Sequence, residues 1–185
     1  DVSTSPAQFS DDIEKQYEHM VRKSQGVFPD AGLRTCVLSA DLAGILAHEA
    51  IGHTTESDIV MSGSVAAGKI GHKVASHLVT LIDFANSCDG QTCPVPVYVD
   101  DEGTKAEDAV IIESGTLRGY MHNKESAKHF GIAPTGNARA FQFSDEPLVR
   151  MRNTAILPGA DNLDDMIASI DDGYYLIKPS NGQAD

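Results

Sequence analysis

The sequence predicts an α+β fold, with a mostly antiparallel sheet, hairpins and a few packed helices. Two observations lead to this class. Apolar residues recur at helical spacing in only a few separate stretches, whereas short apolar runs are joined by turn residues. Strands and helices also do not alternate as the βαβ units of a parallel sheet would require. The 185 residues suffice for one sizeable core in one or two domains.

The first elements are a helix, a strand and a second helix. Residues 10–24 predict an amphipathic helix that Ser10 caps, with apolar residues at Ile13, Tyr17, Met20 and Val21. Residues 33–38 have the composition of a strand. Asp41 is the expected N-cap of the next helix. The buried stripe of that helix is expected to comprise Leu42, Ile45 and Leu46.

The middle of the chain is expected to be richer in strands. Residues 57–73 contain three glycines and little periodicity, which indicates a long, mobile connection. Strands are predicted over residues 77–82 and 95–99. Residues 109–113 and 116–121 flank Ser114-Gly115, a hairpin signal.

The last part of the chain is expected to return to helices. Asn123 is the expected cap of a short helix that Gly131 ends. After an irregular stretch over residues 133–140, a helix has one apolar face made of Leu163, Met166, Ile167 and Ile170. A strand is predicted over residues 174–177.

The most informative motif is His48-Glu49-Ala50-Ile51-Gly52-His53, which follows the second predicted helix. Imidazole is a common zinc ligand, and an adjacent carboxylate can accept a proton from a metal-bound water. On a regular helix, however, residues i and i+5 point about 140° apart. Either the helix ends before His53 or it contains a wider π-type turn. We predict a local break at Gly52, whose backbone is the least restricted.

The motif alone does not establish a metal site. His48 could be a helix residue at the core edge, and His53 a loop residue. Catalytic zinc needs a third protein ligand. No spacing selects one among the candidates, which are Cys36, Glu56, Asp58, His72, His77, Cys88 and Cys93.

Composition narrows the function and the setting. A net charge of −13 argues against nucleic acid as a partner. No apolar run approaches the roughly 20 residues of a membrane-spanning helix, so no membrane association is expected. Cys88 and Cys93 could form a disulfide under oxidising conditions. Three cysteines without a C-x-x-C pair nevertheless favour a reduced, cytoplasmic setting.

The histidine motif and the blocks that follow it resemble the TldD/PmbA family of zinc metallopeptidases. The blocks are Gly68-Lys69-Ile70-Gly71, Val74-Ala75-Ser76 with Leu78-Val79-Thr80, Asp100-Asp101-Glu102-Gly103, Gly115 with Leu117 and Gly119-Tyr120-Met121, Pro134-Thr135-Gly136-Asn137 with Arg139, Arg150-Met151-Arg152-Asn153-Thr154, and Leu157-Pro158-Gly159. They cover the chain from about Leu33 to its end.

The resemblance implies a domain organisation and a metal site. Residues 1–32 would be a helical lead-in, and residues 33–185 the first part of the C-terminal metallopeptidase domain, truncated before its final strands. His48 and His53 would bind Zn²⁺, with Glu49 as the general base. The family's third ligand is a cysteine beyond this chain. Zinc would therefore bind weakly or not at all to this chain, and the fragment itself could be inactive.

The activity implied is hydrolysis of peptide bonds in extended or unfolded peptides by a metal-bound water. A paralogous subunit or a second copy of the chain is the expected protein partner. The alternative is a non-catalytic, peptide-binding subunit of a TldD/PmbA-type heterodimer, which the intact His48-Glu49-His53 set disfavours. Modulation of a DNA enzyme such as gyrase ranks third.

Three further residues are candidates for supporting roles. Glu56 or Asp58 could accept a hydrogen bond from a ligand imidazole, or both could lie in a solvated acidic loop. Asn137 could contact substrate, although Pro134-Thr135-Gly136-Asn137 also has the composition of a simple turn. The hairpin over residues 109–121 could accept an extended peptide at its edge, but burial within the sheet is favoured.

Overall fold

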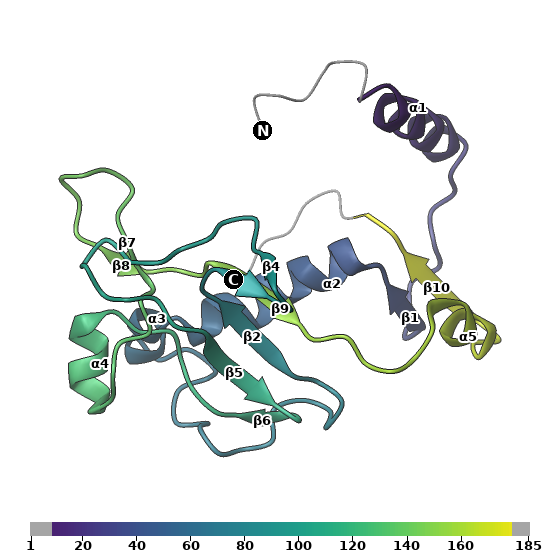
Figure 1. Ribbon diagram of the computed structural model, residues 1–185. Coiled ribbons are helices and arrows are strands. Elements are labelled where there is room, and N and C mark those ends of the chain that lie inside the picture. The colour runs from purple at the N-terminus through teal and green to yellow at the C-terminus, as the bar shows by residue number, and fades with distance from the viewer. Residues whose placement is uncertain (1–8, 179–185) are drawn as a thin grey trace. The chain divides into compact units, whose positions relative to one another are not determined.

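The computed structural model describes residues 9–178 of the chain, which divides into two compact units over residues 1–34 and 35–185 (Figure 1). The first unit contains helix α1 (Ser10–Ser24), as the periodicity predicts. Ser10 is not its cap. Phe9 holds that position without a side-chain hydrogen bond, so Ser10 already lies within the first turn.

A four-stranded antiparallel sheet is the centre of the second unit, with the strand order β6-β5-β2-β9. Its strands are β2 (Leu81–Phe84), β5 (Ala109–Glu113), β6 (Thr116–Leu117) and β9 (Asn153–Ile156). The predicted strand over residues 77–82 thus begins later, at Leu81. The predicted hairpin is confirmed, although its second strand ends at Leu117 rather than at residue 121. Ser114 and Gly115 between β5 and β6 have φ angles of 47° and 80°, as a tight right-twisted turn requires. These features confirm the α+β class.

The other strands form short pairs. β1 (Thr35–Leu38) lies parallel to β10 (Gly173–Leu176), which confirms the first and last predicted strands to within two residues. The antiparallel pairs are β3 (Ser87–Cys88) with β4 (Gln91–Thr92), and β7 (Ala138–Arg139) with β8 (Leu148–Val149).

The strand predicted over residues 95–99 is wrong. Isolated backbone hydrogen bonds, such as that from the Val97 amide to the Ala85 carbonyl (2.8 Å), and one side chain bind this segment in place of a paired strand. Asn153 accepts a hydrogen bond from the Val95 amide (3.0 Å) and donates one to the Val95 carbonyl (2.8 Å). Only Val99 makes an isolated bridge, to Lys105.

A continuous helical run leads from β1 into the candidate site. It comprises α2 (Ala40–Leu46), the π-helical segment η2 (Ala47–Gly52) and the 3₁₀ turn η3 (His53–Thr55). Ser39, not Asp41, is the N-cap of α2, because its hydroxyl accepts a hydrogen bond from the Leu42 amide.

The buried stripe expected on α2 is also wrong. No residue of α2 is buried, and Leu46 is 46% exposed. The buried helical positions are Ala47 and Gly52, one turn further along and within the π-helical segment. The widening of the helix therefore changes which side chains face the core.

Three more helices complete the described chain. α3 (Ser57–Met61) occupies the start of the predicted connection over residues 57–73, so that stretch is not a structureless loop. α4 (Lys124–Phe130) is capped by Asn123 and ended by left-handed Gly131, as predicted. α5 (Leu163–Ala168) begins after Asn162.

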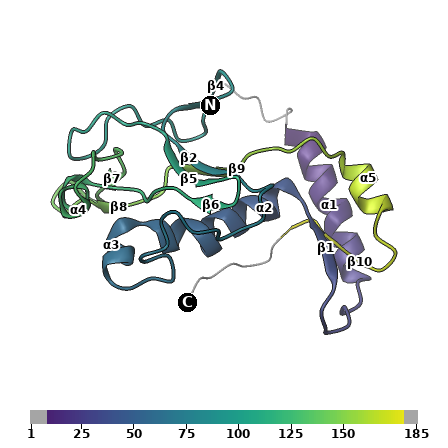
Figure 2. The same ribbon diagram turned by 90° about the horizontal axis from the view of Figure 1, so that it is seen from below.

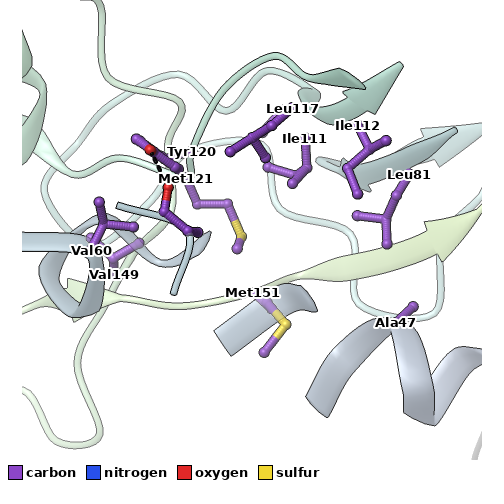
Figure 3. Close-up of a cluster of buried hydrophobic side chains, with 12 residues drawn as sticks. Ala47, Val60, Leu81, Ile111, Ile112, Leu117, Tyr120, Met121, Val149 and Met151 are labelled. Carbon is purple, nitrogen blue, oxygen red and sulfur yellow. Dashed lines mark hydrogen bonds between the residues drawn. The ribbon is translucent and has the colours of Figure 1, made fainter. Parts of the chain in front are cut away.

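The hydrophobic core lies between the sheet and the helical run (Figures 2 and 3). Leu81, Ile111 and Ile112 come from the strands, Met151 precedes β9 and points toward the helical run, and Ala47 faces them from that run. This packing fixes the site helix, which is the continuous run of α2, η2 and η3, against the sheet. Among the described residues, no helix combines the length and the apolar character that crossing a membrane needs.

Candidate metal centre

The π-helical segment brings the two histidines of the motif together. A π-turn links residues i and i+5, the spacing that a regular α-helix separates. The rings of His48 and His53 are 4.7 Å apart and nearly perpendicular. The ligand atoms of His48, Glu49 and His53 all lie within 4.8 Å of one another. Of the two alternatives, the structure has the π-type turn, and the helical run continues through Gly52 into η3 where a local break was predicted.

Gly52 allows this turn for a reason that the sequence did not reveal. Its backbone is helical (φ −56°, ψ −59°), so no unusual angle is required. Space is the constraint, because a Cβ on Gly52 would lie 1.9 Å from Sδ of Met151. Glycine therefore lets the segment after β8 lie directly against the site helix.

Glu56 is the carboxylate in contact with an imidazole of the motif. Its Oε2 is 3.2 Å from Nδ1 of His53, and its Oε1 accepts a hydrogen bond from the Met151 amide. If Nδ1 carries the proton and donates it to Glu56, the Nε2 lone pair of His53 remains available for a metal. Burial raises the pKa of Glu56, although His53 and Arg150 act in the opposite direction.

Asp58 is directed elsewhere. One of its oxygens accepts a hydrogen bond from the Ile59 amide (2.8 Å), and the other accepts one from the Val149 amide (3.3 Å). Arg150 lies 3.8 Å from both Asp58 and Glu56. Both acids therefore connect the chain that follows η3 to β8 and the residues just after it. Only Glu56 also contacts a histidine.

Asn137 is buried and bonded within the protein. Its amide donates hydrogen bonds to Asp83 (2.8 Å) and to the Arg150 carbonyl (2.9 Å). Its side-chain oxygen accepts one from Thr135 (2.6 Å). These contacts place Asn137 in a hydrogen-bond network with Asp83, Thr135 and the Arg150 backbone. His48 and His53 are not part of that network.

Sequence reasoning did not identify the groups that hold Glu56 in place. They are Arg150 and the backbone of Met151, about 95 residues further along the chain. The one available signal was the Arg150-Met151-Arg152 alternation of basic and apolar residues. Both arginines pair with buried acids: Arg150 lies 3.8 Å from Glu56, and Arg152 lies 2.9 Å from Asp83.

The donor set fits a zinc ion. Two imidazoles that converge beside a carboxylate are typical of catalytic zinc sites, which leave a position open for water. Within residues 9–178, only His48, Glu49 and His53 form such a cluster. None of the third-ligand candidates joins them. A third ligand beyond this chain, as the resemblance implies, is compatible with this arrangement.

Comparison with known proteins places the sequence and the fold in one family. Residues 32–185 match the PmbA/TldA metallopeptidase C-terminal domain. A zinc metalloprotease TldD homolog of Saccharolobus solfataricus is 34% identical over 167 residues, which is 90% of this chain and 37% of that protein. A metalloprotease TldD homolog of Buchnera aphidicola is 40% identical over 161 residues, 86% of this chain and 32% of that protein.

A solved structure has the same fold. TldE from Thermococcus kodakarensis superimposes with a TM-score of 0.73 at 26% identity, over 92% of this chain and 39% of that one. The chain thus spans about a third of the length of the curated relatives it matches. By sequence, by fold and by the motif on its π-helix, the chain belongs to the PmbA/TldD family of metallopeptidases and covers its C-terminal domain.

Proposed function

We propose that the chain carries the metal-binding helix of a zinc-dependent peptidase that hydrolyses peptide bonds in extended or unfolded peptides. The observation that carries this proposal is the convergence of His48, Glu49 and His53 within 4.8 Å on a π-helical segment. The names of the relatives as metalloproteases support the same class of activity.

His48 and His53 would hold the zinc, with a third ligand from the remainder of the full-length protein. When bound, the ion would lower the pKa of a water molecule and polarise the peptide carbonyl. The contact with Glu56 would orient the ring of His53 and, with Nδ1 as the donor, would leave Nε2 as its ligand nitrogen. Arg150 and the Met151 amide in turn hold Glu56 in place.

Glu49 would move the proton. It lies beside His48, is half-buried, and has a carboxylate oxygen within 4.8 Å of the ligand nitrogens of both histidines. As general base it would accept a proton from the attacking water and return it to the nitrogen of the leaving amine. The chain would act on peptides together with a paralogous subunit or a second copy of itself.

Metal removal tests the proposal. We expect the full-length protein to cleave an unstructured, quenched fluorescent peptide, to lose that cleavage on treatment with a strong chelator, and to recover it when Zn²⁺ is added. Mg²⁺ should not restore it, because that ion prefers oxygen ligands in octahedral geometry. Undiminished cleavage by protein that elemental analysis shows to be zinc-free would contradict it. Tight peptide binding without cleavage in the zinc-loaded protein would favour a non-catalytic subunit instead.

A further inference from the structure

A cavity of about 410 Å³ lies against the site helix, on a face next to the one that carries the metal-binding motif. Ala50 and Thr54, which directly follow Glu49 and His53, both line it. Its most buried apolar residues are Ile112 and Leu117, each only 2% exposed. The cavity thus has the size and the apolar lining expected of a site for one substrate side chain.

Two positive side chains line the same cavity. Lys69 and Lys73 are both exposed, and within residues 9–178 neither forms an ion pair. Leu117 of β6 forms part of the cavity wall, and the acid nearest to β6 in the sequence is Glu113. Glu113 is already paired with Arg118 at 3.0 Å.

The part of the chain that contains the two lysines is positively charged, whereas the whole chain is negatively charged. Residues 59–82 contain no Asp or Glu, although the whole chain has 27 acidic and 14 basic residues. A cavity with positive side chains in a protein of net charge −13 is complementary to a negatively charged ligand.

The backbone that carries these lysines is fixed to the sheet edge. The Gly71 amide donates to the Leu117 carbonyl (2.8 Å), the Leu117 amide donates to the His72 carbonyl (3.0 Å), and Val74 donates to Gly115 (2.8 Å). Tyr120 also binds the Ala66 carbonyl through its hydroxyl at 2.7 Å. The β6 edge of the hairpin is therefore occupied, and the cavity is preformed and needs little ordering on binding.

We propose that this cavity is a specificity pocket for acidic peptides: it binds one apolar side chain of the substrate, while Lys69 and Lys73 bind the carboxylate of an adjacent Asp or Glu. The apolar walls account for the first contact, since burying an aliphatic side chain is favourable without further partners. The two lysines, which have no acidic partner among the residues that the structure describes, account for the second. This inference rests on the proposed peptidase function, because the bound peptide would be the substrate.

Peptide binding by the full-length protein tests the pocket without any need for turnover. The Glu49→Gln variant, loaded with zinc, would be titrated with labelled, unstructured peptides followed by fluorescence anisotropy. The peptides would share one sequence with an amidated C-terminus and differ only at a central pair: Leu-Glu, Leu-Gln, Leu-Lys or Ala-Glu. We expect Leu-Glu to bind most tightly, and the difference between Leu-Glu and Leu-Lys to shrink as salt is raised.

The double substitution Lys69→Glu with Lys73→Glu is the matching change in the protein. Reversing two charges should weaken Leu-Glu binding by about tenfold or more and reverse the preference toward Leu-Lys. Lys128→Glu, an exposed lysine on α4 that lies outside the cavity, is the control and should leave the order of affinities unchanged.

Equal binding of Leu-Glu, Leu-Gln and Leu-Lys by the protein with both lysines would overturn the pocket assignment. So would an unchanged preference after the double charge reversal, as expected if another part of the full-length protein or a partner subunit fills the cavity. Because both readouts are binding constants, they are separate from the peptidase proposal. That proposal fails on a separate readout: the zinc-loaded protein with Glu49 intact cleaves none of these peptides, or the zinc-free protein cleaves them undiminished.

Discussion

The Glu49→Gln variant of the full-length protein is expected to keep its zinc and to cleave peptides about 10²–10⁴-fold more slowly, the range that a general base contributes. Glutamine has nearly the shape of glutamate, but its neutral amide cannot accept the proton of the attacking water. His48 and His53 remain, so the metal should remain as well. The measurement is kcat on a quenched fluorescent peptide, with zinc content determined on the same sample.

A matched control separates this effect from a general loss of charge. Glu125 is exposed in the first turn of α4, away from the metal-binding motif, and Glu125→Gln makes the same chemical change there. We expect that variant to retain the kcat of the unmodified protein. A Glu49→Gln enzyme with near-normal kcat would refute the role of Glu49.

The second large effect is expected on stability. Arg152→Met should lower the free energy of unfolding by about 3–5 kcal/mol, the usual cost of leaving one charge of a buried ion pair unpartnered. The side chains of Arg152 and Asp83 are 4% and 0% exposed, and their Nε and Oδ2 atoms are 2.9 Å apart. Arg152 also donates to the carbonyls of Thr135 and Glu107, so it joins β9 to two loops.

An exposed pair in the same domain provides the comparison. Arg118 and Glu113 are 3.0 Å apart, but their side chains are 52% and 56% exposed. Arg118→Met should therefore cost at most about 1 kcal/mol. The measurement is the urea-unfolding midpoint and slope of both variants. Adding Asp83→Asn to Arg152→Met should recover part of the loss, because it removes the unpartnered charge. Equal midpoints for Arg118→Met and Arg152→Met would contradict this account.

Local signals in the sequence were sufficient for some elements. Helix α4 follows directly from the Asn123 cap and the Gly131 stop, which act within a few residues of each other. The β5–β6 hairpin follows from Ser114-Gly115 in the same way. The departure from a regular helix at the metal motif was also predictable, because a spacing of five residues leaves few geometries in which both histidines face one ion.

Contacts between distant segments could not be predicted. The segment at Val95 is held by the side chain of Asn153, and no property of either residue announces this pairing. Glu56 is close to His53 in sequence, so its contact with that ring could be proposed. Its burial could not, since burial depends on a strand pair far along the chain. The role of Gly52 depends in the same way on the position of Met151.

Elemental analysis of zinc in the full-length protein tests the central claim most directly. With His48 and His53 both present we expect about one zinc per chain, and with either His48→Ala or His53→Ala we expect that zinc to be lost. Ala substitution at His129, an exposed histidine in the last turn of α4, is the control and should leave the zinc content unchanged. One full equivalent of zinc in both the His48→Ala and the His53→Ala proteins would contradict the assignment of this helix as the metal centre.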